Sequence, residues 1–412
     1  MIRIVSFFVL FFLRLKSSYF FSFLFKINSH ELFILTIPFF SIVLISYIMF
    51  KIFNGIEKKS ELIIFMVLLT FSLCIVSENS YCFLFFLEFC SFCIIFLILD
   101  LSKDYEKFSS TIFIIIFNMV GSLPFFYIFF LTEGKLINCI FISNYYVSRI
   151  MYFIFLCLIL CRKLPIFFFH FWLTKAHVRA SGVCSIILAG LILKLGRFGL
   201  FKFSIILNKI FSYFNSFILR FRIFGIIYFR ILIIRFFDLK YFVACSSVVH
   251  IALSFPLILR GENGGIESRL LMIVGHGLVS FFLFFLVSLI YEFSHNRSFD
   301  FSKSLESLTK FFCFLFFLFF FLNIGVPPFL NFFRELFSLF FIINYSLYFS
   351  FLFFITVLLA CLYLIFCLTK ESFGKIEKFI RLENFSNIFV ISFFFIFCYL
   401  NLIIIFYFFS LF

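Results

Sequence analysis

The sequence predicts an all-α polytopic membrane protein with about 13 transmembrane helices. Apolar residues make up 65% of its 412 residues, charged residues only 13%, and the mean hydropathy is +1.23. A soluble domain carries roughly 25% charged residues. Too few polar side chains remain to cover a water-exposed surface, so the chain is expected to face lipid.

The second observation is a succession of apolar runs, each close to the 20 or so residues that a helix needs to cross a bilayer. The first run lacks a small-residue cleavage site, so we expect a transmembrane helix there rather than a signal peptide. No linker between runs is long enough for a folded extramembrane domain. The expected spans are residues 4–25, 31–53, 61–77, 80–100, 110–132, 149–173, 182–206, 213–236, 240–259, 268–292, 310–341, 343–369 and 385–411.

The third observation is that proline interrupts two spans, at Pro165 and at Pro327-Pro328. Proline removes a backbone donor and clashes with the carbonyl four residues earlier, so each helix should kink or break. Paired broken helices in two halves of a transporter indicate its transport site. We therefore expect two inverted five-helix repeats; ordinary kinks in a helix bundle are the alternative. The expected division is 1–79 for N-terminal helices, 80–206 and 213–369 for the two halves that each contain a broken helix, and 370–412 for a linker and the last helix.

Ionisable residues within the apolar spans carry the functional prediction. A charged side chain at the bilayer centre costs roughly 2.5–3.5 kcal/mol even on the most lenient scale. Such residues are therefore expected to point inward, to pair, and to line a hydrated proton path. Structural ion pairs or snorkelling side chains are the alternative. The residues are Glu88, Lys163, Lys194, Glu335, His250 and His276.

Glu88 and Lys163 form the candidate switching pair. Opposite charges about 4 Å apart at an effective dielectric near 20 interact by roughly 4 kcal/mol. That energy changes a proton-binding constant about a thousandfold. Movement of Glu88 toward or away from Lys163 would thus load or unload a proton near neutral pH, without a cofactor.

Several other classes of protein are disfavoured. The net charge of +15 arises mostly from short linkers, which is typical of membrane topology and lipid-headgroup contact rather than nucleic-acid binding. Cys90 and Cys93 form a lone C-x-x-C pair among 13 scattered cysteines, so we expect neither a metal site nor a disulfide framework. The histidines form no haem, copper or iron pattern, and no nucleotide-binding glycine motif is present. The chain is expected to bind no cofactor.

An ordered succession of motifs gives a more specific prediction. Residues 163–198 read KLPIFFFHFWLTKAHVRASGVCSIILAGLILKLGRF. This string resembles the signature of the antiporter-like, proton-translocating subunits of respiratory complex I (NADH:ubiquinone oxidoreductase): K-x-P, W-L-P-x-A-H, A-P, a serine and L-A-G-x-x-L-K. Residues 238–250 are similar to D-x-K…S-S-x-x-H, residues 276–297 to H-G-L…Y-E-x-x-H-x-R, and residues 327–337 to P-P…G-E-L/F-F. The resemblance covers about residues 80–340.

The resemblance implies a role for each matching charge. Glu88 would tune Lys163, which would be the central proton acceptor beside the first break. Lys194 would pass protons toward the middle of the membrane. Glu335 would be the terminal group before release.

The resemblance also implies roles for neighbouring polar residues. His250 and His276 would belong to a hydrated polar axis between the half-channels. His177, Asp238 and Lys240 are loop or entrance candidates, with simple helix capping as the alternative for the last two.

The glutamate at position 335 makes the chain resemble the subunit-four branch of the family. The subunit-two and subunit-five branches carry lysine at this position. We also expect the chain to be without the long lateral helix of the subunit-five branch. The family usually has fourteen helices, so one N-terminal helix is expected to be missing here.

Five positions depart from the family pattern. Thr174, Arg179 and Ser181 stand where Pro, Glu and Pro are usual, Arg197 replaces a small residue, and Arg334 replaces glycine.

The resemblance implies a location and partners. NADH, FMN, iron–sulfur clusters and ubiquinone would be bound by partner subunits. The chain would contact the other membrane-arm subunits, especially the homologous subunits two and five, and lipids including cardiolipin. Its place would be the mitochondrial inner membrane, and its 86 phenylalanines suggest a T-rich organelle gene. Two alternatives remain open: a homologous subunit of a multisubunit Na⁺/H⁺ antiporter or membrane-bound hydrogenase, and a scaffold subunit with purely structural ion pairs.

Overall fold

The computed structural model of the chain is built from α-helices. Among the described residues, the one β-type pairing is an isolated bridge between Asp238 and Ser298. The all-α prediction is therefore confirmed, whereas the count of 13 helices and the inverted repeats remain predictions. The described residues are 58–77, 80–101, 107–131, 159–160, 162–165, 167, 169–200, 223–236, 238–259, 265–294, 298, 310–327, 329–343 and 347–372. The predictions for some residues concern parts of the chain outside these ranges: the spans 4–25, 31–53 and 385–411, Pro328, and the side chain of Arg334.

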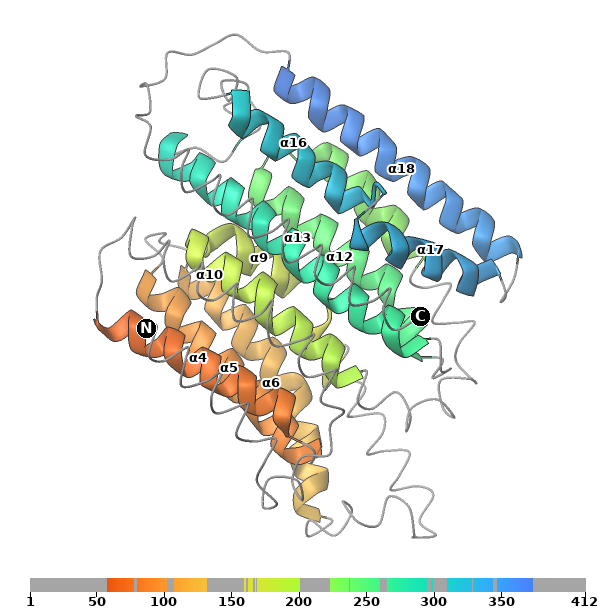
Figure 1. Ribbon diagram of the computed structural model, residues 1–412. Coiled ribbons are helices and arrows are strands. Elements are labelled where there is room, and N and C mark those ends of the chain that lie inside the picture. Colours follow the sequence, from red (N-terminus) through yellow and green to blue (C-terminus); the bar gives the residue numbers. More distant parts are fainter. Residues whose placement is uncertain are drawn as a thin grey trace, which may run out of the picture.

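The first group of helices, coloured orange to yellow-green in Figure 1, contains the first proline break. The helix at residues 159–160 and 162–163 ends in a turn at residues 164–165. The π-helical turn at the end of this group continues as an α-helix over residues 193–200. The group consists of α4 (Lys58–Val76), α5 (Ser80–Leu101), α6 (Lys107–Leu131), α9 (Phe171–Arg179), α10 (Gly182–Ile187) and the π-helical turn η1 (Leu188–Ile192).

The second group follows a helix at 223–235. It consists of α12 (Leu239–Leu259), α13 (Gly265–Ser294), α16 (Lys310–Ile324), α17 (Leu330–Ile343) and α18 (Leu347–Ser372). α13 packs against α10 and η1 of the first group as well as α12, α16 and α17 of its own (Figure 1). Residues 273–290 are all buried, as expected for a helix that is apolar on every face. α13 therefore joins the two groups.

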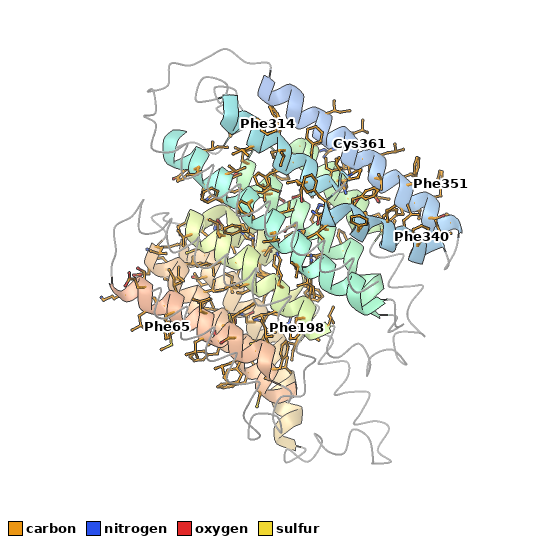
Figure 2. The ribbon with its side chains drawn as sticks, viewed as in Figure 1. Phe65, Phe198, Phe314, Phe340, Phe351 and Cys361 are labelled. Atoms are coloured by element: carbon orange, nitrogen blue, oxygen red, sulfur yellow. The ribbon has the colours of Figure 1, made fainter. Side chains whose placement is uncertain are left out.

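The outer helices turn apolar side chains away from the protein. Phe85, Phe89, Phe92 and Phe96 share one exposed face of α5, and Figure 2 shows side chains such as Phe351 projecting outward from α18. In water such faces would be unfavourable. Three helical segments of the described chain are long and apolar enough to cross a membrane: Cys82–Leu101, Gly182–Leu200 and Ile273–Tyr291. Together these features support the membrane prediction.

Both predicted breaks are present, and a side chain satisfies a backbone carbonyl at each one. At the first break, Trp172 Nε1 donates to the carbonyl of Arg162 at 3.0 Å. At the second, which separates α16 from α17, Asn331 Nδ2 donates to the carbonyl of Leu322 at 2.9 Å. An unsatisfied carbonyl is costly in lipid. These two hydrogen bonds therefore stabilise the helix ends at the two breaks.

Proline alone does not produce a break. Pro124 lies within α6 and Pro256 within α12, and both helices continue past it. The expectation that proline would mark only two spans was thus incomplete. Membrane helices tolerate proline where neighbouring groups satisfy the freed carbonyl. At the second break the chain also needs Gly325, whose φ is +90°.

Gly325→Ala is expected to destabilise the second break by roughly 1–3 kcal/mol. L side chains rarely adopt a φ of +90°, and an added Cβ would lie 3.2 Å from the Glu335 carboxylate. The measurement is the midpoint of thermal inactivation of the solubilised complex. The Gly325→Asn variant should lose less stability than the alanine variant, because asparagine tolerates a positive φ. An unchanged midpoint for the alanine variant would contradict this reading.

Candidate functional site

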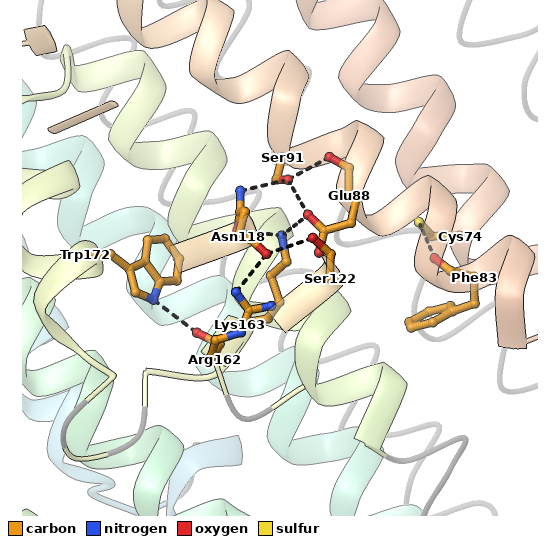
Figure 3. Close-up of polar contacts among 9 residues, drawn as sticks. All are labelled: Cys74, Phe83, Glu88, Ser91, Asn118, Ser122, Arg162, Lys163 and Trp172. Carbon is orange, nitrogen blue, oxygen red and sulfur yellow. Dashed lines mark hydrogen bonds and ion pairs between the residues drawn. The ribbon is translucent and has the colours of Figure 1, made fainter. Parts of the chain in front are cut away.

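Glu88 of α5 and Lys163 at the first break form a buried ion pair. Lys163 Nζ lies 3.2 Å from Glu88 Oε2, and both side chains are buried (Figure 3). The helix turns just after Lys163, which leaves its ammonium beside α5 and α6. The structure thus brings together the two residues that the sequence suggested as a switching pair.

Two neutral residues complete this cluster. Asn118 of α6 accepts a hydrogen bond from Lys163 Nζ at 3.0 Å and donates to Ser91 Oγ at 3.1 Å. Ser91 Oγ lies 3.3 Å from Glu88 Oε2. A closed ring of contacts therefore fixes the ion pair (Figure 3). Sequence reasoning missed both residues; the one available signal was an amide side chain in an otherwise apolar stretch of α6.

Asn118→Leu is expected to cost roughly 1–3 kcal/mol of stability, because it leaves the Lys163 ammonium and the Ser91 hydroxyl with fewer partners at similar side-chain volume. It should also slow turnover, since Lys163 would no longer be held beside Glu88. Thermal inactivation and NADH oxidation of the assembled complex measure the two effects. Ser122→Ala is the control, because within the described part of the chain Ser122 bonds only the Asn118 carbonyl, at 2.9 Å. Equal effects of the two changes would contradict the role given to the amide.

Lys194 lies two residues after the π-helical segment η1 and is 1% exposed. Its ammonium donates to the carbonyl of Ala189 at 2.5 Å and to Ser280 Oγ of α13 at 3.0 Å. A π turn widens a helix and is frequent at functional sites. Here it supplies a carbonyl that Lys194 reaches by folding back along its own helix.

A second cluster continues from Ser280 toward the second break. His276 lies one turn before Ser280 on α13, so the two residues share a face. The rings of His276 and His250 are 5.5 Å apart, and His250 Nδ1 is 3.9 Å from Glu335 Oε1. Lys194, His276, His250 and Glu335 therefore follow one another through the centre of the described helices.

The first cluster is not hydrogen-bonded to Lys194 in the part of the chain that the structure describes. The helices that carry them do touch: a Cβ at Gly196 would lie 3.2 Å from the Lys163 Cβ. Among the described residues, Lys163 and Lys194 are thus neighbours through helix packing and not through a hydrogen bond.

The remaining sequence candidates lie beside this series. Asp238 Oδ1 accepts from the backbone of Lys240 at 2.9 Å and so caps α12, whereas the Lys240 ammonium donates to the carbonyl of Ala180 at 2.9 Å. The His177 ring stacks on Phe284 at 4.3 Å. Neither His177 ring nitrogen has a hydrogen-bond partner among the described residues.

Within the described ranges, no group of three or more His, Cys, Asp or Glu residues could hold a metal ion. Cys90 and Cys93 are buried free thiols on α5.

A family model for the transmembrane part of NADH:quinone oxidoreductase and Mrp antiporter subunits matches residues 77–363. The chain belongs to this family. The match includes every charged and histidine residue of the two clusters. Family membership therefore agrees with the resemblance that the motifs indicated.

Curated relatives of the family point to one branch. NADH-ubiquinone oxidoreductase chain 4 of Locusta migratoria is 33% identical over 279 residues, which cover 66% of this chain and 62% of the relative. Chain 4 of Rhipicephalus sanguineus is 31% identical over 322 residues, covering 77% and 73%. The matched region thus spans less than two thirds of the locust protein. The subunit-four prediction made from Glu335 is confirmed by these relatives.

Solved structures of the family share the fold. A chain of respiratory complex I from Thermus thermophilus superposes with a TM-score of 0.69 at 18% identity, covering 85% of this chain and 80% of that one. A chain of the Mrp complex from Dietzia sp. superposes at 0.75 with 12% identity, covering 85% and 67%.

Proposed function

We propose that this chain is the subunit-four, proton-translocating component of an NADH:ubiquinone oxidoreductase. It would move protons across the membrane while partner subunits transfer electrons from NADH to ubiquinone. The observation that carries the proposal is a series of ionisable side chains through otherwise apolar helices, all of them buried except Glu335, which is partly buried. The series is Glu88, Lys163, Lys194, His276, His250 and Glu335.

The two lysines differ in a way that suits directional transfer. Lys163 has a carboxylate at 3.2 Å, whereas Lys194 is bonded to two neutral oxygens and has no carboxylate within 4 Å among the described residues. A positive charge is therefore stabilised more strongly at Lys163 in this state. Withdrawal of Glu88 would remove roughly 4 kcal/mol of that preference. The proton could then move toward Lys194 and, through the histidines, toward Glu335.

The cellular setting follows from the same proposal. The chain would lie in the mitochondrial inner membrane, encoded by an organelle genome, beside the homologous subunits two and five and phospholipids such as cardiolipin. NADH, FMN, iron–sulfur clusters and ubiquinone would be held by partners.

A subunit of a multisubunit Na⁺/H⁺ antiporter is the second candidate, because the Mrp chain shares the fold. Native electrophoresis of gently solubilised membranes, stained for NADH oxidation, separates the two. We expect the tryptic fragment of residues 261–269 in the NADH-active band. Its recovery only from another complex would overturn the complex I assignment.

A further inference from the structure

Arg162 places a second buried cation beside the Glu88–Lys163 pair. Its side chain is only 3% exposed, and Nη1 donates to the Asn118 carbonyl at 2.8 Å. Lys163 Nζ bonds the side-chain oxygen of the same Asn118 at 3.0 Å. Both cations therefore converge on one residue of α6 (Figure 3).

The position of the guanidinium is specifically accommodated. Gly121, one turn after Asn118, lies directly against it, and any Cβ at Gly121 would overlap the guanidinium. The Trp172 indole bonds the Arg162 carbonyl at 3.0 Å and holds its backbone. Gly121 thus leaves space for the Arg162 guanidinium, and the Trp172 hydrogen bond fixes the Arg162 carbonyl.

The hydrogen-bonding capacity of Arg162 and Glu88 is only partly used. Arg162 Nε and Nη2, and Glu88 Oε1, have no hydrogen-bond partner among the described residues. Glu88 bonds Lys163 through its other oxygen, Oε2. An arginine matches a carboxylate with two parallel donors. The two groups with spare capacity are therefore chemically complementary.

Charge explains why a second cation would be useful. If Glu88 withdrew from Lys163 with no other partner, a buried carboxylate would be left uncompensated, which is strongly unfavourable. Arginine keeps its charge at every physiological pH, so it can receive Glu88 whether or not Lys163 holds a proton. Arg162 would make dissociation of the pair easier without itself exchanging a proton.

We propose that Arg162 is a positioning residue that acts as the alternative partner of Glu88. Reorientation of the Glu88 carboxylate carries it from Lys163 to Arg162 and leaves Lys163 bonded to Asn118 alone. The proposal rests on the proton-translocating function proposed above and adds the counter-charge that allows the pair to open.

The test uses the assembled complex in sealed vesicles and measures NADH oxidation and protons translocated. Arg162→Met keeps the stem but removes the charge, and is expected to lower proton translocation on the order of tenfold. Arg162→Lys keeps the charge and should retain most of the proton translocation. In a Glu88→Gln background, Arg162→Met should cause no further loss, because Arg162 acts through Glu88.

Gly121→Ala provides a second test if Arg162→Met fails to assemble. The added methyl displaces the guanidinium, so translocation should fall when Arg162 is present. In the Arg162→Lys background, whose shorter ammonium side chain need not fill this space, the same change should have a clearly smaller effect. Normal translocation by Arg162→Met, or an equal loss with and without Glu88, would overturn the proposal. If Glu88→Gln and Lys194→Met also translocate normally, the proposed function itself fails instead.

Discussion

Lys194→Met is expected to lower proton translocation by about 100-fold or more, the range in which positioned acid–base groups contribute. Lys194 is the ionisable residue between the Glu88–Lys163 cluster and the histidines, and its ammonium contacts α13 through Ser280 at 3.0 Å. Methionine has a similar length and an apolar character, so it can fill the same buried space. It cannot carry a proton, and the series would be interrupted at its centre.

The measurement is acidification coupled to NADH oxidation in sealed vesicles that contain the assembled complex. Lys175→Met is the matched control, because the Lys175 ammonium lies over the Phe113 ring at 3.6 Å, and Phe113 is not a member of the series. The control should pump normally. Normal pumping by Lys194→Met would remove Lys194 from the path and favour the scaffold alternative.

Glu88→Gln is expected to reduce the protons moved per electron and to slow turnover on the order of tenfold. Glutamine keeps the shape of the side chain but removes the counter-charge of Lys163, which lies 3.2 Å away. Removing one partner of a buried pair also destabilises a protein by about 3–5 kcal/mol, since the other charge is left uncompensated. The thermal midpoint of the complex should therefore fall together with its pumping.

Glu88→Asp separates these two effects. Aspartate retains the negative charge at a greater distance, so stability should recover more fully than pumping if the distance to Lys163 controls proton release. Thermal inactivation and the ratio of protons to electrons measure both quantities on one preparation. Full pumping by Glu88→Gln would show that the ion pair is structural only.

Sequence alone was sufficient to predict the fold class and indicated two places where helices break. Both predictions follow from local chemistry: the number of consecutive apolar residues sets a membrane span, and a proline that removes a backbone donor favours a break. Pro124 and Pro256 show the limit of this reasoning, because their helices continue. Whether a proline breaks a helix depends on which neighbouring groups satisfy its freed carbonyl, and that is a tertiary property.

The sequence also identified the charges of the series, because an ionisable residue in an apolar span is conspicuous and costly. Only the tertiary structure decided their partners. Asn118 and Ser280 are neutral and distant in sequence from Lys163 and Lys194, whose ammonium groups they bind. Ser91 is likewise neutral and joins Asn118 to Glu88. In the sequence Arg162 resembles an ordinary linker cation. The structure shows that Gly121 of α6 lies against its guanidinium. Composition and spacing determine what must be buried, whereas the packing of helices determines what each buried charge meets.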